Sequence, residues 1–150
     1  MGAKELSRTH KALALTVAAA LALAGCASPE DAIDPKGKTF DGIAPAEIIT
    51  LTGTEPFWAI RINGAEATYS NPEHPEGFAF AVARFAGNNG LGLTGTLFGA
   101  PVTITLTPGK CSDGMSDRTF PYVATVALGE ETLRGCGYTD KQPYTGEAAP

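Results

Sequence analysis

The side chains best suited to chemistry lie in two short segments of the 150-residue chain. One is Gly53-Thr-Glu-Pro-Phe-Trp58, which holds the only tryptophan, and the other is Cys111-Ser-Asp-Gly-Met-Ser-Asp-Arg118. A carboxylate near an indole, or near a hydroxyl and a guanidinium, is typical of a surface that binds a ligand or a protein partner. The candidate partner-binding residues are Glu55, Trp58, Asp113, Ser116, Asp117 and Arg118.

Both segments also have a purely structural interpretation. In the first, a residue before proline prefers extended backbone, and Trp58 would enter the core at the start of a strand. In the second, Asp113 and Ser116 would hydrogen-bond nearby backbone amides, Gly114 would supply a positive φ, and Arg118 would pair with a carboxylate. The residues alone leave the two interpretations open.

Few residues are suited to catalysis. The two histidines are His10, in a basic N-terminal segment, and His74, in a proline-rich stretch. The chain has no Ser-His-Asp order and no G-x-S-x-G elbow. Asp113 and Asp117 lack the spacing of a calcium-binding loop, and nothing in the sequence suggests that either is buried. We therefore predict a protein that is not an enzyme and that uses neither a cofactor nor a metal.

The N-terminal residues predict export. Lys4, Arg8 and Lys11 form a basic segment, and an uncharged apolar run over 12–24 follows it. This run is shorter than the roughly 20 residues that span a bilayer, so it is typical of the apolar region of a signal peptide. It ends in Leu23-Ala24-Gly25-Cys26, which resembles the lipobox of bacterial lipoproteins. The alternative is an ordinary signal peptide that is cut after an A-x-A-like site, with Cys26 left unmodified.

The lipobox resemblance implies an anchor. Cleavage would remove residues 1–25, and Cys26 would carry acyl chains such as palmitate, each contributing about 0.8 kcal/mol per buried CH₂. Ala27 stands where lipoproteins retained in the inner membrane have aspartate, which implies the periplasmic face of the outer membrane. Residues 26–39 would form a polar, flexible tether.

The composition of the remaining chain predicts a small all-β domain. The sequence is 43% hydrophobic and 18% charged, and its 18 glycines and 11 prolines are too many for a helical bundle. The whole chain has a net charge of −5, and the leader contributes +2 of it, which leaves −7 for the residues after position 25. An acidic body of this kind argues against binding to nucleic acid and against an electrostatic contact with anionic lipid.

Alternation of apolar and polar residues recurs between turn signals. Trp58, Ile60 and Ile62 share one face of a strand, and Asn63-Gly64 after them indicates a hairpin turn. The longest expected connections are 70–77 and 108–121. The expected strands are 47–51, 56–62, 65–69, 78–85, 91–98, 102–107, 122–128 and 132–138.

About eight short antiparallel strands over residues 40–138 predict a small barrel or a strongly curved sheet, because closure removes exposed strand edges. A two-sheet sandwich is the alternative. Residues 139–150 are predicted to be a disordered tail. Two cysteines, Cys111 and Cys136, are left beside the anchor, and in an exported chain such a pair usually forms a disulfide. A redox pair or a pair of metal ligands would need a C-x-x-C motif or a nearby histidine.

The two chemical segments, together with Leu133-Arg-Gly-Cys136, resemble the motifs of a YajI-like family of small bacterial envelope lipoproteins. The match covers residues 50–137, with Phe120 where tyrosine is usual and Gly137 where alanine is common. The resemblance implies a lipid-anchored envelope protein and brings no activity with it. The architecture is also loosely similar to that of the lipoprotein inhibitors of C-type lysozyme, a similarity of fold alone.

These observations favour a non-catalytic binding or inhibitor module in the periplasm, anchored to the membrane through Cys26. Its partner would be an envelope protein or a lysozyme-like hydrolase, contacted through residues 111–121. One alternative is a structural or envelope-stress lipoprotein whose motifs only determine the fold. The other is a binder of a small apolar ligand inside the barrel, although Trp58, Phe78 and Phe80 would fill a narrow interior.

Overall fold

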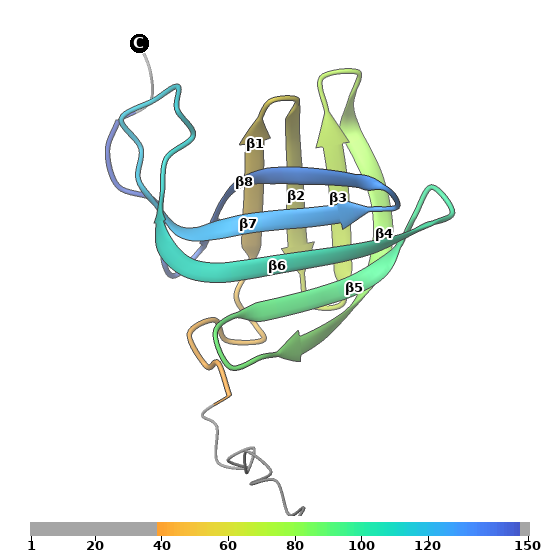
Figure 1. Ribbon diagram of the computed structural model, residues 1–150, viewed down its shortest axis with the longest axis horizontal. Coiled ribbons are helices and arrows are strands. Elements are labelled where there is room, and N and C mark those ends of the chain that lie inside the picture. The colour runs from red at the N-terminus through yellow and green to blue at the C-terminus, as the bar shows by residue number, and fades with distance from the viewer. Residues whose placement is uncertain (1–38, 148–150) are drawn as a thin grey trace, which may run out of the picture. The chain divides into compact units, whose positions relative to one another are not determined.

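The structure, a computed structural model, describes residues 39–147, and these form a barrel made entirely of strands (Figure 1). The predicted signal peptide, Cys26 and nearly all of the predicted tether lie outside the described residues. Within the described range, no helix has the length and hydropathy needed to cross a membrane. The strands are β1 (Ile49–Thr54), β2 (Phe57–Asn63), β3 (Glu66–Asn71), β4 (His74–Ala86), β5 (Leu91–Leu97), β6 (Ala100–Cys111), β7 (Phe120–Leu128) and β8 (Glu131–Thr139).

The strands pair in chain order, and β8 closes the barrel against β1. All neighbours are antiparallel, and the closing register places Ile49 opposite Thr139 and Thr52 opposite Cys136. The prediction of an eight-stranded antiparallel barrel is therefore confirmed, and the sandwich alternative is not the fold of this chain.

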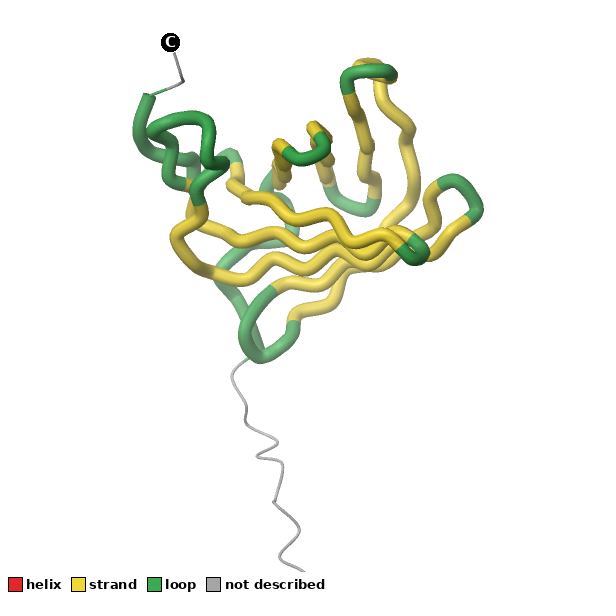
Figure 2. Tube along the Cα trace, turned by 45° about the horizontal axis from the view of Figure 1, so that its top comes forward, coloured by secondary structure: helices red, strands yellow, loops and turns green. Residues whose placement is uncertain are grey.

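The alternating pattern of each strand determines which side chains fill the barrel. In β6, Val102, Ile104 and Leu106 are buried, while the threonines between them are exposed. In β2, Trp58, Ile60 and Ile62 are buried in the same way. Because successive side chains of a strand point to opposite faces, a period of two places one set inside a closed sheet. Figure 2 shows the strands wrapping around this interior.

Two connections are shorter than the sequence predicted. Only Pro72 and Glu73 separate β3 from β4, where a loop over 70–77 was expected. β6 continues through Pro108 to Cys111, so the second loop covers 112–119 rather than 108–121. The register between β6 and β7 shifts between Pro108 and Cys111, and an irregularity of this kind tolerates a residue without an N–H inside a strand.

The prediction of a disordered tail is wrong for residues 139–147. Thr139 is fully buried at the end of β8. Farther along, Thr145 and Thr119 exchange two backbone hydrogen bonds of 2.8 and 2.9 Å. The Tyr144 ring packs against Phe120, with a centroid distance of 5.3 Å. The polar composition of this segment concealed the aromatic contacts and the backbone pairing that hold it on the barrel.

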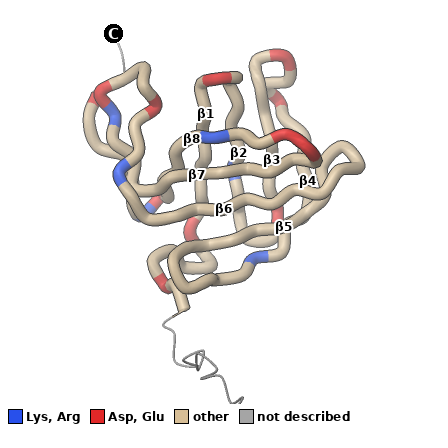
Figure 3. The backbone as a smooth tube through the Cα atoms, viewed as in Figure 1, with Lys and Arg blue, Asp and Glu red and all other residues tan. Residues whose placement is uncertain are grey.

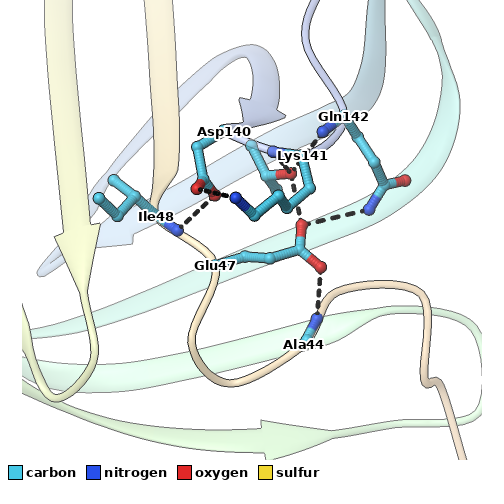
Figure 4. A network of polar contacts seen from close by, with 7 residues as sticks. Ala44, Glu47, Ile48, Asp140, Lys141 and Gln142 are labelled. Carbon is cyan, nitrogen blue, oxygen red and sulfur yellow. Dashed lines mark hydrogen bonds and ion pairs between the residues drawn. The ribbon is translucent and has the colours of Figure 1, made fainter.

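A polar network joins the segment before β1 to the segment after β8 (Figure 4). The Glu47 carboxylate accepts hydrogen bonds from the Ala44 amide, the Thr139 hydroxyl and the Gln142 side chain. The Asp140 carboxylate accepts one from the Ile48 amide at 3.0 Å. These contacts hold the two chain ends of the barrel together next to the pairing of β1 with β8.

Candidate functional site

The structure brings together the two segments that carry the candidate site residues, 53–58 and 111–118. Residues 53–58 comprise the end of β1, the turn at Glu55 and Pro56 and the start of β2, and residues 112–119 form the loop between β6 and β7. The Thr54 hydroxyl donates a hydrogen bond of 3.3 Å to the Asp113 carbonyl. A cavity of about 290 Å³ lies between the segments, and its walls include Thr54, Asp113, Val123 and Arg134. The two segments are therefore parts of one surface.

Trp58 belongs to the core, as the structural interpretation expected. Its side chain is 3% exposed. A Cβ atom added to Gly53 would lie 2.1 Å from the indole Nε1, and one added to Gly135 would lie 3.0 Å from the Cζ2 of the same ring. Both glycines thus leave the space that the indole occupies. Among the described residues, Nε1 has no hydrogen-bond partner, so Trp58 acts here through packing.

The exposed residues of the first segment are Glu55, Pro56 and Phe57. The peptide bond between Glu55 and Pro56 is cis, and Glu55 is exposed. Phe57 is 52% exposed at the beginning of β2. Phe57 is not among the site residues predicted from the sequence, although the alternation that buries Trp58 places its neighbour on the opposite, solvent-facing side.

Asp113 organises the loop between β6 and β7. One carboxylate oxygen accepts hydrogen bonds from the Met115 amide (3.0 Å) and the Ser116 amide (2.9 Å), and the other accepts one from the Ser116 hydroxyl (2.8 Å). Gly114 has a φ of +72°, which favours glycine. The hydrogen bonds from Met115, and then from Ser116, lower the pKa of Asp113 below its ordinary value. The structural prediction for these three loop residues is confirmed.

Arg118 differs from the prediction that it pairs with a carboxylate. Its guanidinium lies over the Tyr144 ring, 4.4 Å from the centroid, which is a cation–π contact. Gly146 lets the C-terminal segment pass close to the backbone of the loop, because a Cβ at this position would lie 2.1 Å from the Asp117 carbonyl oxygen. Arg118 therefore attaches the loop to the C-terminal segment, while the Asp117 residue is exposed. Tyr144 was assigned to a disordered tail, so the sequence offered no partner of this kind.

The Cys111–Cys136 disulfide is present as predicted, with a Cα–Cα distance of 5.6 Å. It joins the end of β6 to β8, two strands that are separated in the barrel by β7. Cys136 is 1% exposed, whereas Cys111 is partly exposed at the wall of the cavity. The covalent bond fixes one end of the loop directly on the barrel wall.

Within residues 39–147, no group of three or more histidine, cysteine, aspartate or glutamate side chains could hold a metal ion. The His74 ring lies 3.5 Å from the Glu76 carboxylate and packs edge-on against Phe78, at the tip of the β3–β4 hairpin. Two exposed apolar side chains lie at this site: Val123, which is 42% exposed, lines the cavity, and Met115, which is 59% exposed, lies on the 112–119 loop. No protein-family model, curated protein or solved structure matches this chain.

Proposed function

We propose that this protein is a lipid-anchored, non-catalytic binding module of the bacterial cell envelope. Its anchor would be Cys26, lipidated after removal of residues 1–25, and the domain would face the periplasm from the outer membrane. The sequence from Leu23 to Cys26 supports the anchor, and the lack of a histidine near Asp113 and Asp117 in the chain supports a role without catalysis.

One observation carries the binding role, which is an exposed apolar side chain on an internally braced loop. Met115 is 59% exposed although the loop on both sides of it is held by the Asp113 hydrogen bonds, the disulfide and the contact between Arg118 and Tyr144. A loop that is already ordered loses little conformational entropy on binding, so an exposed anchor there contributes more to affinity. Asp113, Ser116 and Arg118 would shape the loop, while Met115 and Asp117 would contact the partner.

The partner that we propose is an envelope protein, with a lysozyme-like hydrolase as the first class to test. The full-length protein in neutral detergent should inhibit at least one enzyme of a lysozyme panel, and Met115→Ser should weaken the inhibition at least tenfold, because an interface anchor is lost. Phe85→Ser is the matched control, since Phe85 is 53% exposed and lies near the end of β4, outside the 112–119 loop. Equal inhibition by both variants, or an absence of inhibition and of binding to peptidoglycan fragments, would count against the proposal.

The anchor has its own test. In cells grown with a clickable palmitate analogue, the wild-type protein should carry the label and should sediment with the membranes. Cys26→Ser should abolish both the label and the sedimentation, because acyl chains need the thiol. Labelling that persists in Cys26→Ser would place the modification elsewhere in the chain.

The packing of Trp58 against Gly53 and Gly135 favours a second candidate, a structural or envelope-stress lipoprotein whose motifs are fold determinants. Under this alternative, Met115→Ser and Asp117→Ala leave every binding measurement unchanged. Only variants of packed motif residues would then alter the protein, and they would do so by lowering its stability.

A further inference from the structure

Three hollows that share lining residues form one groove along β1, β2 and β3. The first, of about 290 Å³, lies against the 112–119 loop and shares Thr52 and Gly53 with the second, of about 300 Å³. The second shares Phe57, Asn71 and Pro72 with the third, of about 270 Å³, which reaches the β3–β4 turn. The groove therefore runs from the disulfide-bonded loop to the tip of the β3–β4 hairpin.

The groove combines an apolar wall with acidic residues at the β1–β2 and β3–β4 turns. Phe57 is 52% exposed, and it lines both the middle and the far hollow, where Pro72 lies beside it. Glu73 lines the far hollow, and the exposed residues Glu55 and Glu76 flank the two turns. Figure 3 shows these acidic positions at the β1–β2 turn and at the tip of the β3–β4 hairpin. Arg134 is the basic group of the wall at the loop end.

From this arrangement we infer that the groove binds an extended segment of the partner protein, in which basic side chains flank an apolar one. The inference rests on the proposed function and names the chemistry of the partner. An open, elongated channel suits an extended chain better than a compact ligand, which would need an enclosing pocket. The apolar side chain would contact Phe57, and lysine or arginine side chains would reach Glu73 and Glu55.

The chain carries its own reporter for this binding. Trp58 is the only tryptophan, and it lines the middle hollow. The full-length protein in neutral detergent can be titrated with three tryptophan-free synthetic peptides of about nine residues, which span about 30 Å when extended. All three carry leucine at alternate positions, and the positions between are lysine, serine or glutamate. Binding is followed by the fluorescence of Trp58 and by calorimetry.

The lysine peptide should bind at least tenfold more tightly than the serine peptide, and the glutamate peptide should not bind. The affinity for the lysine peptide should fall as salt is raised from about 50 to about 300 mM, because screening weakens attraction between exposed charges. Equal affinity for the lysine and serine peptides would overturn the inference, as would the absence of saturable binding. Tighter binding of a peptidoglycan fragment that the lysine peptide does not displace would also overturn it.

Matched variants locate the site. Phe57→Ser should weaken binding of the lysine peptide at least tenfold and Glu73→Gln about two- to fivefold, since an exposed ion pair contributes less than a buried apolar contact. The controls are Phe85→Ser and Glu66→Gln, which change an equally exposed phenylalanine and a glutamate at the opposite end of β3. Glu73 is exposed, so Glu73→Gln also serves if Phe57→Ser fails to fold.

Indistinguishable effects of the groove and control variants would overturn the inference. This outcome can be separated from a failure of the proposed function. Inhibition that depends on Met115, together with no binding of the lysine peptide, would refute the groove and retain the loop as the binding site. The reverse pattern would retain a basic partner and reject the loop.

Discussion

At the scale of single residues, the tryptophan motif is explained by two glycines that are distant from each other in the chain. Gly53 lies opposite Trp58 in the pairing of β1 with β2, and Gly135 is on β8. A Cβ at Gly53 would lie 2.1 Å from the indole, and one at Gly135 would lie 2.0 Å from the carbonyl oxygen of Thr52. The indole therefore packs against bare backbone from two strands, and neither position has room for a methyl group.

Gly53→Ala should destabilise the barrel by about 1–3 kcal/mol, the usual range for overpacking a rigid core. The measurement is urea unfolding followed by circular dichroism. Gly109→Ala is the control, because a Cβ there would meet only Val123 at 3.7 Å and the free energy of unfolding should change by less than about 0.5 kcal/mol. Equal stability of the two variants would show that Trp58 can move away from β1 without cost.

At the scale of elements, the 112–119 loop depends on two attachments outside itself. The disulfide fixes its beginning to β8, and the contact of Arg118 with Tyr144 fixes its end to the segment after β8. Inside the loop, Asp113 satisfies the amides of Met115 and Ser116. A surface loop with this bracing holds one conformation, which is what a preorganised binding surface requires.

Replacing both Cys111 and Cys136 with serine should lower the free energy of unfolding by about 3–4 kcal/mol, because the bond closes a loop with a sequence separation of 25 residues in the unfolded chain. Urea unfolding with and without a reductant measures this. The reductant should lower the stability of the wild type to that of the double variant and leave the double variant unchanged. A wild type insensitive to complete reduction would contradict the prediction.

Tyr144→Ala should loosen the 112–119 loop and leave the barrel intact. The ring contacts Arg118 and Phe120, so its removal deprives the end of the loop of its support. Hydrogen exchange should show faster exchange over residues 112–119, while the strands β2 and β3 keep their protection. Tyr144→Phe is the control, because it keeps the ring that Arg118 contacts, and it should leave exchange in the loop as it is in the wild type. Unchanged exchange in Tyr144→Ala would mean that the disulfide and Asp113 suffice.

At the scale of the whole molecule, the two ends of β1 make different contacts. At its beginning, Glu47, Thr139 and Gln142 join the chain segments that enter and leave the barrel. At its far end, Thr54 contacts the 112–119 loop. Tyr122 adds to the first end. Its hydroxyl donates to the Gln142 side-chain oxygen at 2.7 Å and lies 3.1 Å from the Gly42 carbonyl oxygen, and burial raises its pKa. The groove thus lies near the far end of β1, and the hydrogen bonds of Glu47 lie at its beginning.

The polar network of Glu47 and Asp140 predicts that the stability of the fold falls in acid. Desolvation would raise the pKa of Glu47, but the hydrogen bonds from Thr139, Ala44 and Gln142 outweigh it and the pKa is lowered. The Ile48 amide lowers the pKa of Asp140. The folded protein therefore binds these protons less readily than the unfolded chain does, so their stabilisation is complete above the ordinary glutamate value of 4.5 and is lost as the pH falls below it.

Unfolding in urea at a series of pH values should give constant stability down to about pH 5 and a progressive loss below it. Glu47→Gln should be less stable than the wild type at neutral pH and should lose less stability on acidification, because one of the titrating carboxylates is absent. A wild type whose stability stays constant or rises below pH 4.5 would contradict the sign of this linkage.

The sequence predicted the strands well where burial on one side imposes a strict alternation. Val102, Ile104 and Leu106 could be assigned to the interior from their spacing alone, and the disulfide followed from the number of cysteines left for pairing. Prediction failed where contacts with distant residues outweighed the local sequence signal. Pro108 lies inside β6 at a shift of register, and the segment around Tyr144 looked like a solvated tail. In both places the outcome depends on a neighbouring strand that the local sequence does not contain.

The sequence by itself determined the class of fold, the inward faces of β2, β4 and β6 and the pairing of the cysteines, because these depend on short-range periodicity and on composition. Only the tertiary structure decided that Gly53, Trp58 and Gly135 pack together, that Arg118 lies over Tyr144, and that three hollows join into one groove. The glycine–tryptophan packing arises from closure of β1 against β8, and the contact of Arg118 with Tyr144 accompanies the pairing of Thr119 with Thr145. Each brings together residues that are far apart in the chain. A pattern of period two specifies which face of a strand is buried, but not which distant strand covers it.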